Sequence, residues 1–282
     1  MKKTHLINTG GKLLSTEVPL VMGIVNITPD SFYKQSRLST SGEVVAKVSG
    51  MISDGASIID IGGSSTRPGA QPIDEEEEKI RVIGILKQLR REFPDSVLSI
   101  DTYRASVARE AFYEAGINII NDISGGTMDS RMFPLVKELN IPYIMMHING
   151  TPETMQSCTD YDDVVSDIIK FFGMRIPQLL DAGVKDIIID PGIGFGKTAQ
   201  QNFEILARLM EFSVVGLPLM LGLSRKSFIW KTLNQDPSDA LNGTTALNMA
   251  GLMNGADILR VHDVAEAVQT VRLYEKMRVN DD

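Results

Sequence analysis

The sequence predicts an α/β protein, a (β/α)8 TIM barrel in a single domain. Short, apolar, β-branched runs alternate with helix-like segments along the chain, and there are eight such runs. No linker or low-complexity stretch separates them. Apolar strands separated by helices are typical of a parallel sheet covered on its outer face. The 282 residues match the usual length of one closed barrel, so we expect a barrel rather than an open doubly wound sheet.

The eight candidate strands are read directly from these runs. They are VMGIVN (21–26), SIIDIGG (57–63), VLSID (97–101), INIIND (117–122), IPYIMMH (141–147), DIIID (186–190), PLMLGLS (218–224) and ADILRVH (256–262). Residues 1–18 precede the first strand, and we expect them to form an N-terminal extension at the bottom of the barrel. The barrel itself would then span residues 19–282.

Helix-like segments fill most of the intervals between the strands. Examples are residues 43–56, 74–93, 104–116 and 162–183. Several end in Ala-Gly or Asp-Gly just before a strand, which is a common helix stop. Four glutamates, residues 75–78, fall in the first turn of one helix, where acids complement the helix dipole. We expect them to form a solvated face.

Composition excludes several classes of protein. The net charge of -8 argues against a nucleic-acid partner, because phosphate backbones require basic surface. No apolar run is long enough to cross a membrane, and the N-terminal residues lack the apolar core of a signal peptide. The single cysteine, Cys158, permits no intrachain disulfide, which favours a reducing, cytoplasmic location. No His/Cys cluster has zinc-site spacing.

Polar residues stand at or just past the end of every predicted strand. They are Asn26, Asp60, Asp101, Asn121 with Asp122, His147, Asp190, the run Ser224, Arg225 and Lys226, and Arg260 with His262. One such residue is most simply a loop residue that satisfies the backbone, and His147 fits a structural or a functional role equally well. In a barrel, however, all eight strand ends open onto one face, where active sites are built. The pattern therefore predicts a site at this face.

The residue types at this face indicate what the site could bind. Carboxylates and amides suit a flat heterocycle that carries N–H donors. Arginines, His262 and the Thr66 hydroxyl suit phosphate oxygens. Together they indicate a heterocycle that carries a phosphate or diphosphate.

The glycine-rich stretch DPGIGFGKT (190–198) is not a nucleotide-binding loop. A P-loop requires glycine where this chain has Pro191, and the dinucleotide pattern requires glycine where it has Lys197. These glycines instead allow the backbone to approach a ligand closely.

From Val21 to its C-terminus the chain resembles dihydropteroate synthase, a pterin-binding barrel enzyme of folate biosynthesis. The resemblance rests on several motifs together: MGIVNITPDSF (22–32), GGSSTRPGA (62–70), SIDTYRASVAREA (99–111), IINDISGG (119–126), MHINGTPETMQ (146–156), DPGIGFGKT, GLSRKSFI (222–229) and DILRVHDV (257–264). It implies a Mg²⁺-dependent, homodimeric transferase. The enzyme would condense p-aminobenzoate with 6-hydroxymethyl-7,8-dihydropterin diphosphate and would be a target of sulfonamides.

The resemblance also implies roles for individual residues. The pterin-binding positions are Asp101, Asn121, Asp190, Lys226 and Arg260, of which Asp101, Lys226 and Arg260 are also catalytic. The diphosphate-binding positions are Asn26, Thr66, Arg67, Arg260 and His262, with Asn26 as the Mg²⁺ ligand. The p-aminobenzoate-binding positions are Thr66, Pro68, Phe195 and Ser227. The implied mechanism is a dissociative substitution in which an anionic Asp101 stabilises a cation on the pterin methylene.

One segment departs from the family's pattern, and two other functions remain open. After TPDSF the family commonly continues Ser-Asp-Gly-Gly, whereas this chain reads YKQSR (33–37). A pterin-dependent methyltransferase acting with a corrinoid protein would grip its pterin similarly, but it has no need of STRPGA or SRKS. A degenerate, non-catalytic barrel would be expected to lose charge at Asp101, Lys226 or Arg260, and none is lost.

Overall fold

The computed structural model describes residues 3–27, 37–64 and 73–278. Within these residues, eight parallel strands form one sheet in the order β8-β7-β6-β5-β4-β3-β10-β9. The strands are β3 (Leu20–Asn26), β4 (Ile58–Gly62), β5 (Leu98–Asp101), β6 (Ile119–Asp122), β7 (Tyr143–Met146), β8 (Ile187–Asp190), β9 (Met220–Leu221) and β10 (Ile258–Val261). A bridge between Ile189 and Leu219 joins the two ends of this order and closes the barrel. The predicted (β/α)8 fold is confirmed.

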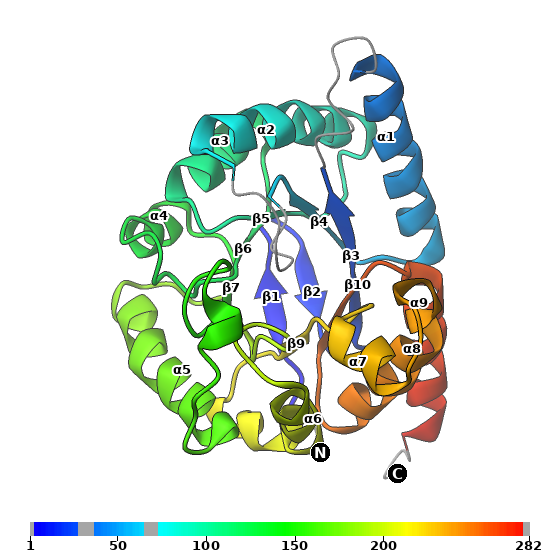
Figure 1. The fold of residues 1–282 in the computed structure, drawn as a ribbon. Helices are drawn as coiled ribbons and strands as arrows, with labels where there is room; N and C mark the ends of the chain where they lie inside the picture. Colours follow the sequence, from blue (N-terminus) through cyan, green and yellow to red (C-terminus); the bar gives the residue numbers. More distant parts are fainter. Residues whose placement is uncertain (1–2, 28–36, 65–72, 279–282) are drawn as a thin grey trace.

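Helices surround the sheet as a ring (Figure 1). The α-helices are α1 (Arg37–Asp54), α2 (Glu75–Glu92), α3 (Ala105–Ala115), α4 (Met132–Leu139), α5 (Val164–Asp181), α6 (Ala199–Ala207), α7 (Ser227–Thr232), α8 (Ala240–Met253) and α9 (Val264–Met277). Short 3-10 turns are η2 (Met155–Ser157), η3 (Leu209–Val215) and η4 (Pro237–Asp239). None of the helices described is both long and apolar enough to cross a membrane.

Local sequence accounts for several helix boundaries. Helix α2 begins after Asp74, whose side chain accepts a hydrogen bond from the Glu77 backbone N–H. Helix α6 begins with a capping box, in which Thr198 and Gln201 satisfy each other's backbone N–H groups. Helix α3 ends at Gly116, which adopts the left-handed conformation that glycine tolerates best.

Two apolar layers hold the barrel together. The larger lies between the outer face of the strands and the helices. The smaller fills the barrel interior near the N-terminal ends of the strands, with at least one side chain from each strand or the residue before it: Leu20, Met22, Ile58, Val97, Ile119, Ile144, Ile188, Met220 and Ile258. Ile7 and Leu14 belong to this inner layer.

Those two residues come from an antiparallel hairpin, β1 (Leu6–Asn8) and β2 (Leu13–Ser15). Hydrogen bonds tie it to the starts of distant strands: the Asn8 backbone N–H donates to Asp186 Oδ1, and Asn118 Nδ2 donates to the Thr9 carbonyl. The hairpin therefore plugs the N-terminal end of the barrel, as expected. The domain boundary at residue 18 stays a prediction.

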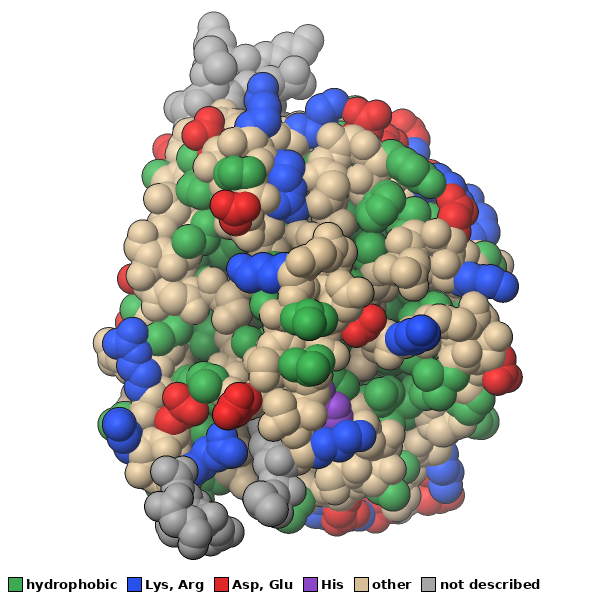
Figure 2. Space-filling model, turned by 180° about the vertical axis from the view of Figure 1, so that it is seen from behind, with side chains coloured by type: hydrophobic (Ala, Val, Ile, Leu, Met, Phe, Trp, Pro, Cys, Tyr) green, Lys and Arg blue, Asp and Glu red, His purple; other side chains and the backbone are tan. Residues whose placement is uncertain are grey.

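The expected solvated face of glutamates 75–78 is wrong for Glu78. Its side chain is 1% exposed and pairs with Arg104. The cause is close packing of α2 against the end of β4, where a Cβ on Gly63 would lie 3.2 Å from Glu78 Cγ. On the opposite side of the molecule from Figure 1, acidic and basic side chains are interspersed (Figure 2).

Candidate active site

A change from apolar to polar side chains along the barrel interior builds the site. Successive side chains of a strand point to opposite faces, so every second residue points inward. Four inner-layer isoleucines are each followed, two residues later, by a polar residue. The pairs are Ile58 and Asp60, Ile119 and Asn121, Ile188 and Asp190, and Ile258 and Arg260. The polar group therefore gathers at the carboxyl ends of the strands.

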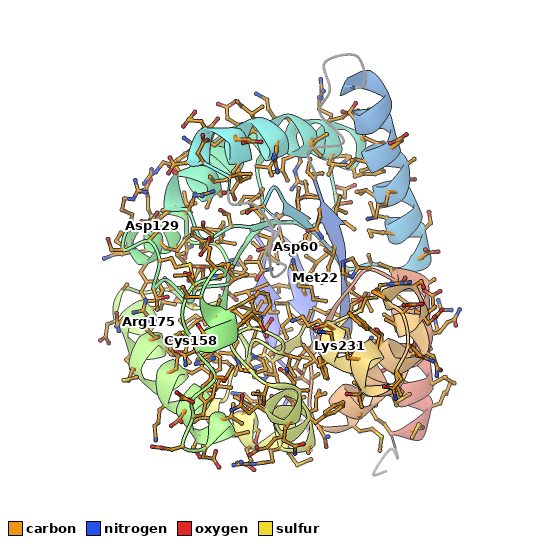
Figure 3. All side chains as sticks on the ribbon, in the orientation of Figure 1. Met22, Asp60, Asp129, Cys158, Arg175 and Lys231 are labelled. Atoms are coloured by element: carbon orange, nitrogen blue, oxygen red, sulfur yellow. The ribbon has the colours of Figure 1, made fainter. Side chains whose placement is uncertain are left out.

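The Arg260 guanidinium lies at the centre of this group. It donates to Asp60 Oδ2 at 2.7 Å and to Asp101 Oδ2 at 2.5 Å. The Asn121 side-chain amide donates to the same Asp60 oxygen at 2.9 Å. Asp60 lies near the middle of the barrel (Figure 3). Its other oxygen, Oδ1, is buried and has no hydrogen-bond partner among the described residues.

Burial and the neighbouring charges shift the pKa values of Asp101 and Arg260. Burial raises the pKa of Asp101 to about 7, although Arg260 opposes the shift and the Asp60 charge adds to it. Burial also works against the Arg260 charge, but Asp60 and Asp101 outweigh it and raise the pKa of Arg260. A permanent cation thus lies between two carboxylates, one of which titrates near neutrality.

Asp190 and Lys226 form a second charged group in the site. Burial raises the pKa of Asp190, and Lys226 opposes that shift. Burial lowers the pKa of Lys226 to about 7, with Asp190 acting in the opposite sense. Asp190 Oδ1 accepts the Gly192 backbone N–H at 2.7 Å, which fixes the carboxylate at the start of the glycine-rich loop.

That glycine-rich loop also forms the surroundings of the Lys226 amine. Nζ donates to the Ile193 carbonyl and lies 4.5 Å from the centroid of the Phe195 ring. On the strand side, a Cβ on Gly222 would lie 3.7 Å from Asp190 Oδ2 and 3.9 Å from Arg260 Cβ. Glycine at 222 therefore leaves space between the two charged groups.

His262 and Asn26 lie at the ends of neighbouring strands. Ser224 Oγ lies 3.0 Å from His262 Nδ1 and accepts the His262 backbone N–H at 3.2 Å. Where the hydroxyl donates to Nδ1, the ring proton is on Nε2; where Nδ1 carries the proton, it donates to the hydroxyl oxygen. Asn26 ends β3 on the other side of Gly62 from Asp101: a Cβ on Gly62 would lie 3.4 Å from Asn26 Oδ1 and 3.4 Å from Asp101 Cβ.

The donor set limits the kind of metal that could bind. Over residues 3–27, 37–64 and 73–278, no group of three or more His, Cys, Asp or Glu side chains is placed to hold a metal ion. Mg²⁺ prefers oxygen ligands, retains waters and is commonly bound together with substrate phosphates. The Asn26 amide oxygen fits such an ion as one ligand among several, the others being phosphate oxygens and water.

Most of the predicted site residues come together at this face. Asp101, Asn121 and Arg260 meet around Asp60. Lys226 lies near both Asp190 and Phe195, and Asn26 and His262 lie at adjoining strand ends. Ser227 is exposed at the first position of α7. Thr66, Arg67 and Pro68 lie outside the described residues, as do residues 28–36 of the loop that departs from the family's pattern.

Not every polar residue at a strand end faces the site. Arg225 forms a two-pronged ion pair with Asp263, with both distances 2.8 Å. In the view of Figure 3, Cys158 lies apart from Asp60.

Sequence reasoning gave no role to three residues that organise the site. Asp60 was recognisable only as a polar strand end, although it is 0% exposed and binds both Arg260 and Asn121. Ser224 orients His262. Lys197 has no sequence signal beyond its place in the glycine-rich loop, where it is buried.

Comparisons with known proteins agree with this geometry. The family model described as "Pterin binding enzyme" matches residues 22–262. The dihydropteroate synthase of Synechocystis is 44% identical over 260 residues, which cover 91% of this chain and 89% of the relative.

Solved structures give the same result. The dihydropteroate synthase of Yersinia pestis, in complex with a sulfonamide drug, superposes with a TM-score of 0.90 at 38% identity, covering 97% of this chain and 99% of that one. The Xanthomonas albilineans enzyme with 4-aminobenzoic acid superposes with a TM-score of 0.89 at 35% identity, covering 98% and 99% of the two chains. The chain therefore belongs to the pterin-binding enzymes and, among them, to the dihydropteroate synthase family.

Proposed function

We propose that the chain catalyses the dihydropteroate synthase reaction. It joins p-aminobenzoate to 6-hydroxymethyl-7,8-dihydropterin diphosphate and gives 7,8-dihydropteroate and diphosphate. One observation carries the proposal: Arg260 lies between Asp60 and Asp101 at the mouth of a barrel of this family, with Asp190 and Lys226 in the same mouth.

The pterin is bound by hydrogen-bond acceptors and donors that match those of its flat ring. The carboxylates of Asp101 and Asp190 accept N–H groups. Asn121 and Lys226 offer donors to ring oxygen and nitrogen atoms. The planar guanidinium of Arg260 can lie against the ring face.

The diphosphate lies at the strand ends that carry Asn26, His262 and Arg260. With the Ser224 hydroxyl donating to Nδ1, His262 would offer its Nε2–H to a diphosphate oxygen. By resemblance, Thr66 and Arg67 add to this end of the site. When bound with the diphosphate at Asn26, Mg²⁺ would supply positive charge to the leaving oxygen.

The chemistry is a dissociative substitution. The bond between the pterin methylene and the diphosphate oxygen breaks, and Arg260 stabilises the charge that develops on the leaving group. The resulting methylene cation is stabilised by the carboxylate of Asp101. The p-aminobenzoate nitrogen then forms the new bond and releases its proton. Phe195 and Ser227, with Thr66 and Pro68 by resemblance, line the p-aminobenzoate position.

The test is release of diphosphate by the purified protein with Mg²⁺ and both substrates. We expect release that depends on p-aminobenzoate and is competitively inhibited by a sulfonamide. Diphosphate release that is indifferent to p-aminobenzoate, or no turnover at all, would overturn the proposal.

We also propose that the protein is a cytoplasmic homodimer. A single cysteine in the sequence supports a reducing location. The adjoining helices α8 and α9 carry exposed Met253, Leu273 and Met277, which a second copy could cover. The small residues Gly243 and Gly251 of α8 pack internally, against Ile229 and Leu221. Sedimentation of the purified protein at micromolar concentration checks the assembly, and a monomer would refute it.

A further inference from the structure

Lys197 is buried inside the loop that follows β8. Its side chain is 5% exposed, yet it carries an amine that none of the roles above uses. Nζ lies 2.9 Å from the Gly192 carbonyl, 2.9 Å from the Phe195 carbonyl and 3.1 Å from His147 Nδ1. An ammonium has three N–H donors, and each has an acceptor here.

Chemistry on the His147 side agrees with this arrangement. Burial, and then the charge of Lys197, lower the pKa of His147 to about 2. The ring is therefore neutral at physiological pH, and Nδ1 can accept a hydrogen bond from the amine. Aromatic contacts with Phe171 and Tyr161 hold the ring in place.

The rest of the loop is held from both sides. Asn202 Oδ1 accepts the Gly194 backbone N–H at 2.7 Å, and Tyr161 donates to the Gly196 carbonyl at 2.9 Å. Gly192 lies so close to His147 that a Cβ there would be 1.9 Å from the His147 carbonyl oxygen. The Lys197 side chain links two carbonyls of the loop to His147, the residue after the end of β7.

We propose that Lys197 is a positioning residue that fixes the loop of residues 191–198, and with it the Phe195 wall of the p-aminobenzoate position. The Phe195 carbonyl is bonded directly to the buried amine. The same loop gives the Lys226 amine its carbonyl partner at Ile193. The assignment of the wall rests on the proposed synthase function, whereas the fixing of the loop does not.

The electrostatic surroundings give Lys197 a second effect. The titratable groups that face it are Asp190, His147 and Lys226. Burial lowers the pKa of Lys197 to about 7, with Asp190 opposing the shift and Lys226 adding to it. The Lys197 charge in turn lowers the pKa of Asp190, so its removal would make that carboxylate harder to ionise.

The experiment compares Lys197→Met with Lys185→Met, which removes an exposed lysine before β8. In Lys197→Met we expect KM for p-aminobenzoate to rise about tenfold, while pterin affinity at pH 8 changes less than threefold. The acid limb of pterin binding should move to higher pH, because Asp190 then loses its charge at a higher pH. Lys185→Met should leave all three unchanged.

Hydrogen exchange of residues 191–198 provides a readout without turnover. We expect exchange about tenfold faster in Lys197→Met than in the unaltered protein. Should that variant fail to fold, Lys197→Gln carries the comparison, since its amide keeps two N–H donors and should give smaller changes in the same directions.

The outcomes separate the two proposals. Lower kcat with unchanged KM and unchanged loop exchange would show that Lys197 supports only the fold, and the inference would be overturned. Faster loop exchange in a protein whose unaltered form makes no dihydropteroate would keep the positioning role and reject the synthase function.

Discussion

Replacing Asp60 with asparagine tests the centre of the site most directly. Asp60 is fully buried, and its Oδ2 accepts from both Arg260 and Asn121. Asparagine has nearly the same shape, so the substitution removes a charge without opening a cavity. Arg260 then keeps Asp101 as its only charged partner of the two, at 2.5 Å, and is free to move towards it.

The expected size of the effect follows from the lost interaction. A hydrogen bond to a charged group contributes about 1.5–3 kcal/mol, more than a neutral one. Asparagine retains one carbonyl acceptor, so we expect a loss of about 2 kcal/mol in pterin binding rather than the full amount. That corresponds to roughly a 30-fold weaker dissociation constant.

Titration of the dihydropterin substrate by calorimetry measures this constant, and a thermal melt reports folding in parallel. Asp257→Asn is a matched control: Asp257 is also buried but accepts the Leu219 backbone N–H at the start of β10, away from the mouth. The control should lower stability and leave pterin affinity unchanged. A dissociation constant within twofold of the unaltered protein in Asp60→Asn would refute the role given to Asp60.

Three further changes probe other parts of the molecule. Asp101→Asn should lower turnover about 100-fold, since one well-placed charge contributes about 3 kcal/mol to the barrier; pterin affinity should fall far less, and equal losses in both would contradict a transition-state role. The pKa of Lys226, lowered to about 7, predicts that pterin affinity declines as pH rises above 7, because the amine loses its charge there. Lys226→Met should abolish that decline. An unaltered pH profile in this variant would show that another group causes the decline. Gly192→Ala should destabilise the protein by at least about 2 kcal/mol in urea unfolding, because the new Cβ would meet the His147 carbonyl oxygen at a φ of +70°. Gly173→Ala, whose Cβ meets nothing within 4 Å, is its control, and equal stability of the two variants would count against the strain.

The sequence predicted the barrel and the side of it that carries the site, because both depend on patterns that repeat along the chain. A period of two, with isoleucine followed by a polar residue, sets which side chains enter the mouth. The strand predicted at 218–224 is shorter in the structure, where it spans Met220–Leu221. It is flanked by Pro218, which lacks a backbone N–H, and by Gly222, and both residue types weaken strands.

The sequence did not reveal which ion-pair and hydrogen-bond partners individual side chains have. Arg225 has a φ of +57° and pairs with Asp263, 38 residues later, instead of entering the site. Glu78 and Lys197 are charged residues in a helix turn and a loop, both usually solvated, yet tertiary packing buries both. Such choices depend on contacts between distant segments, which local periodicity does not encode.

The hairpin at the barrel's base has a consequence for the order of folding. Ile7 and Leu14 find their apolar neighbours only when all eight strands stand side by side, and two of the hydrogen bonds span 109 and 178 residues. The N-terminal hairpin is therefore expected to dock last, onto a barrel whose strands have already paired. Pulse-labelling during refolding would show its amides protected after those of the strands above it, and simultaneous protection would mean that closure and sealing are one event.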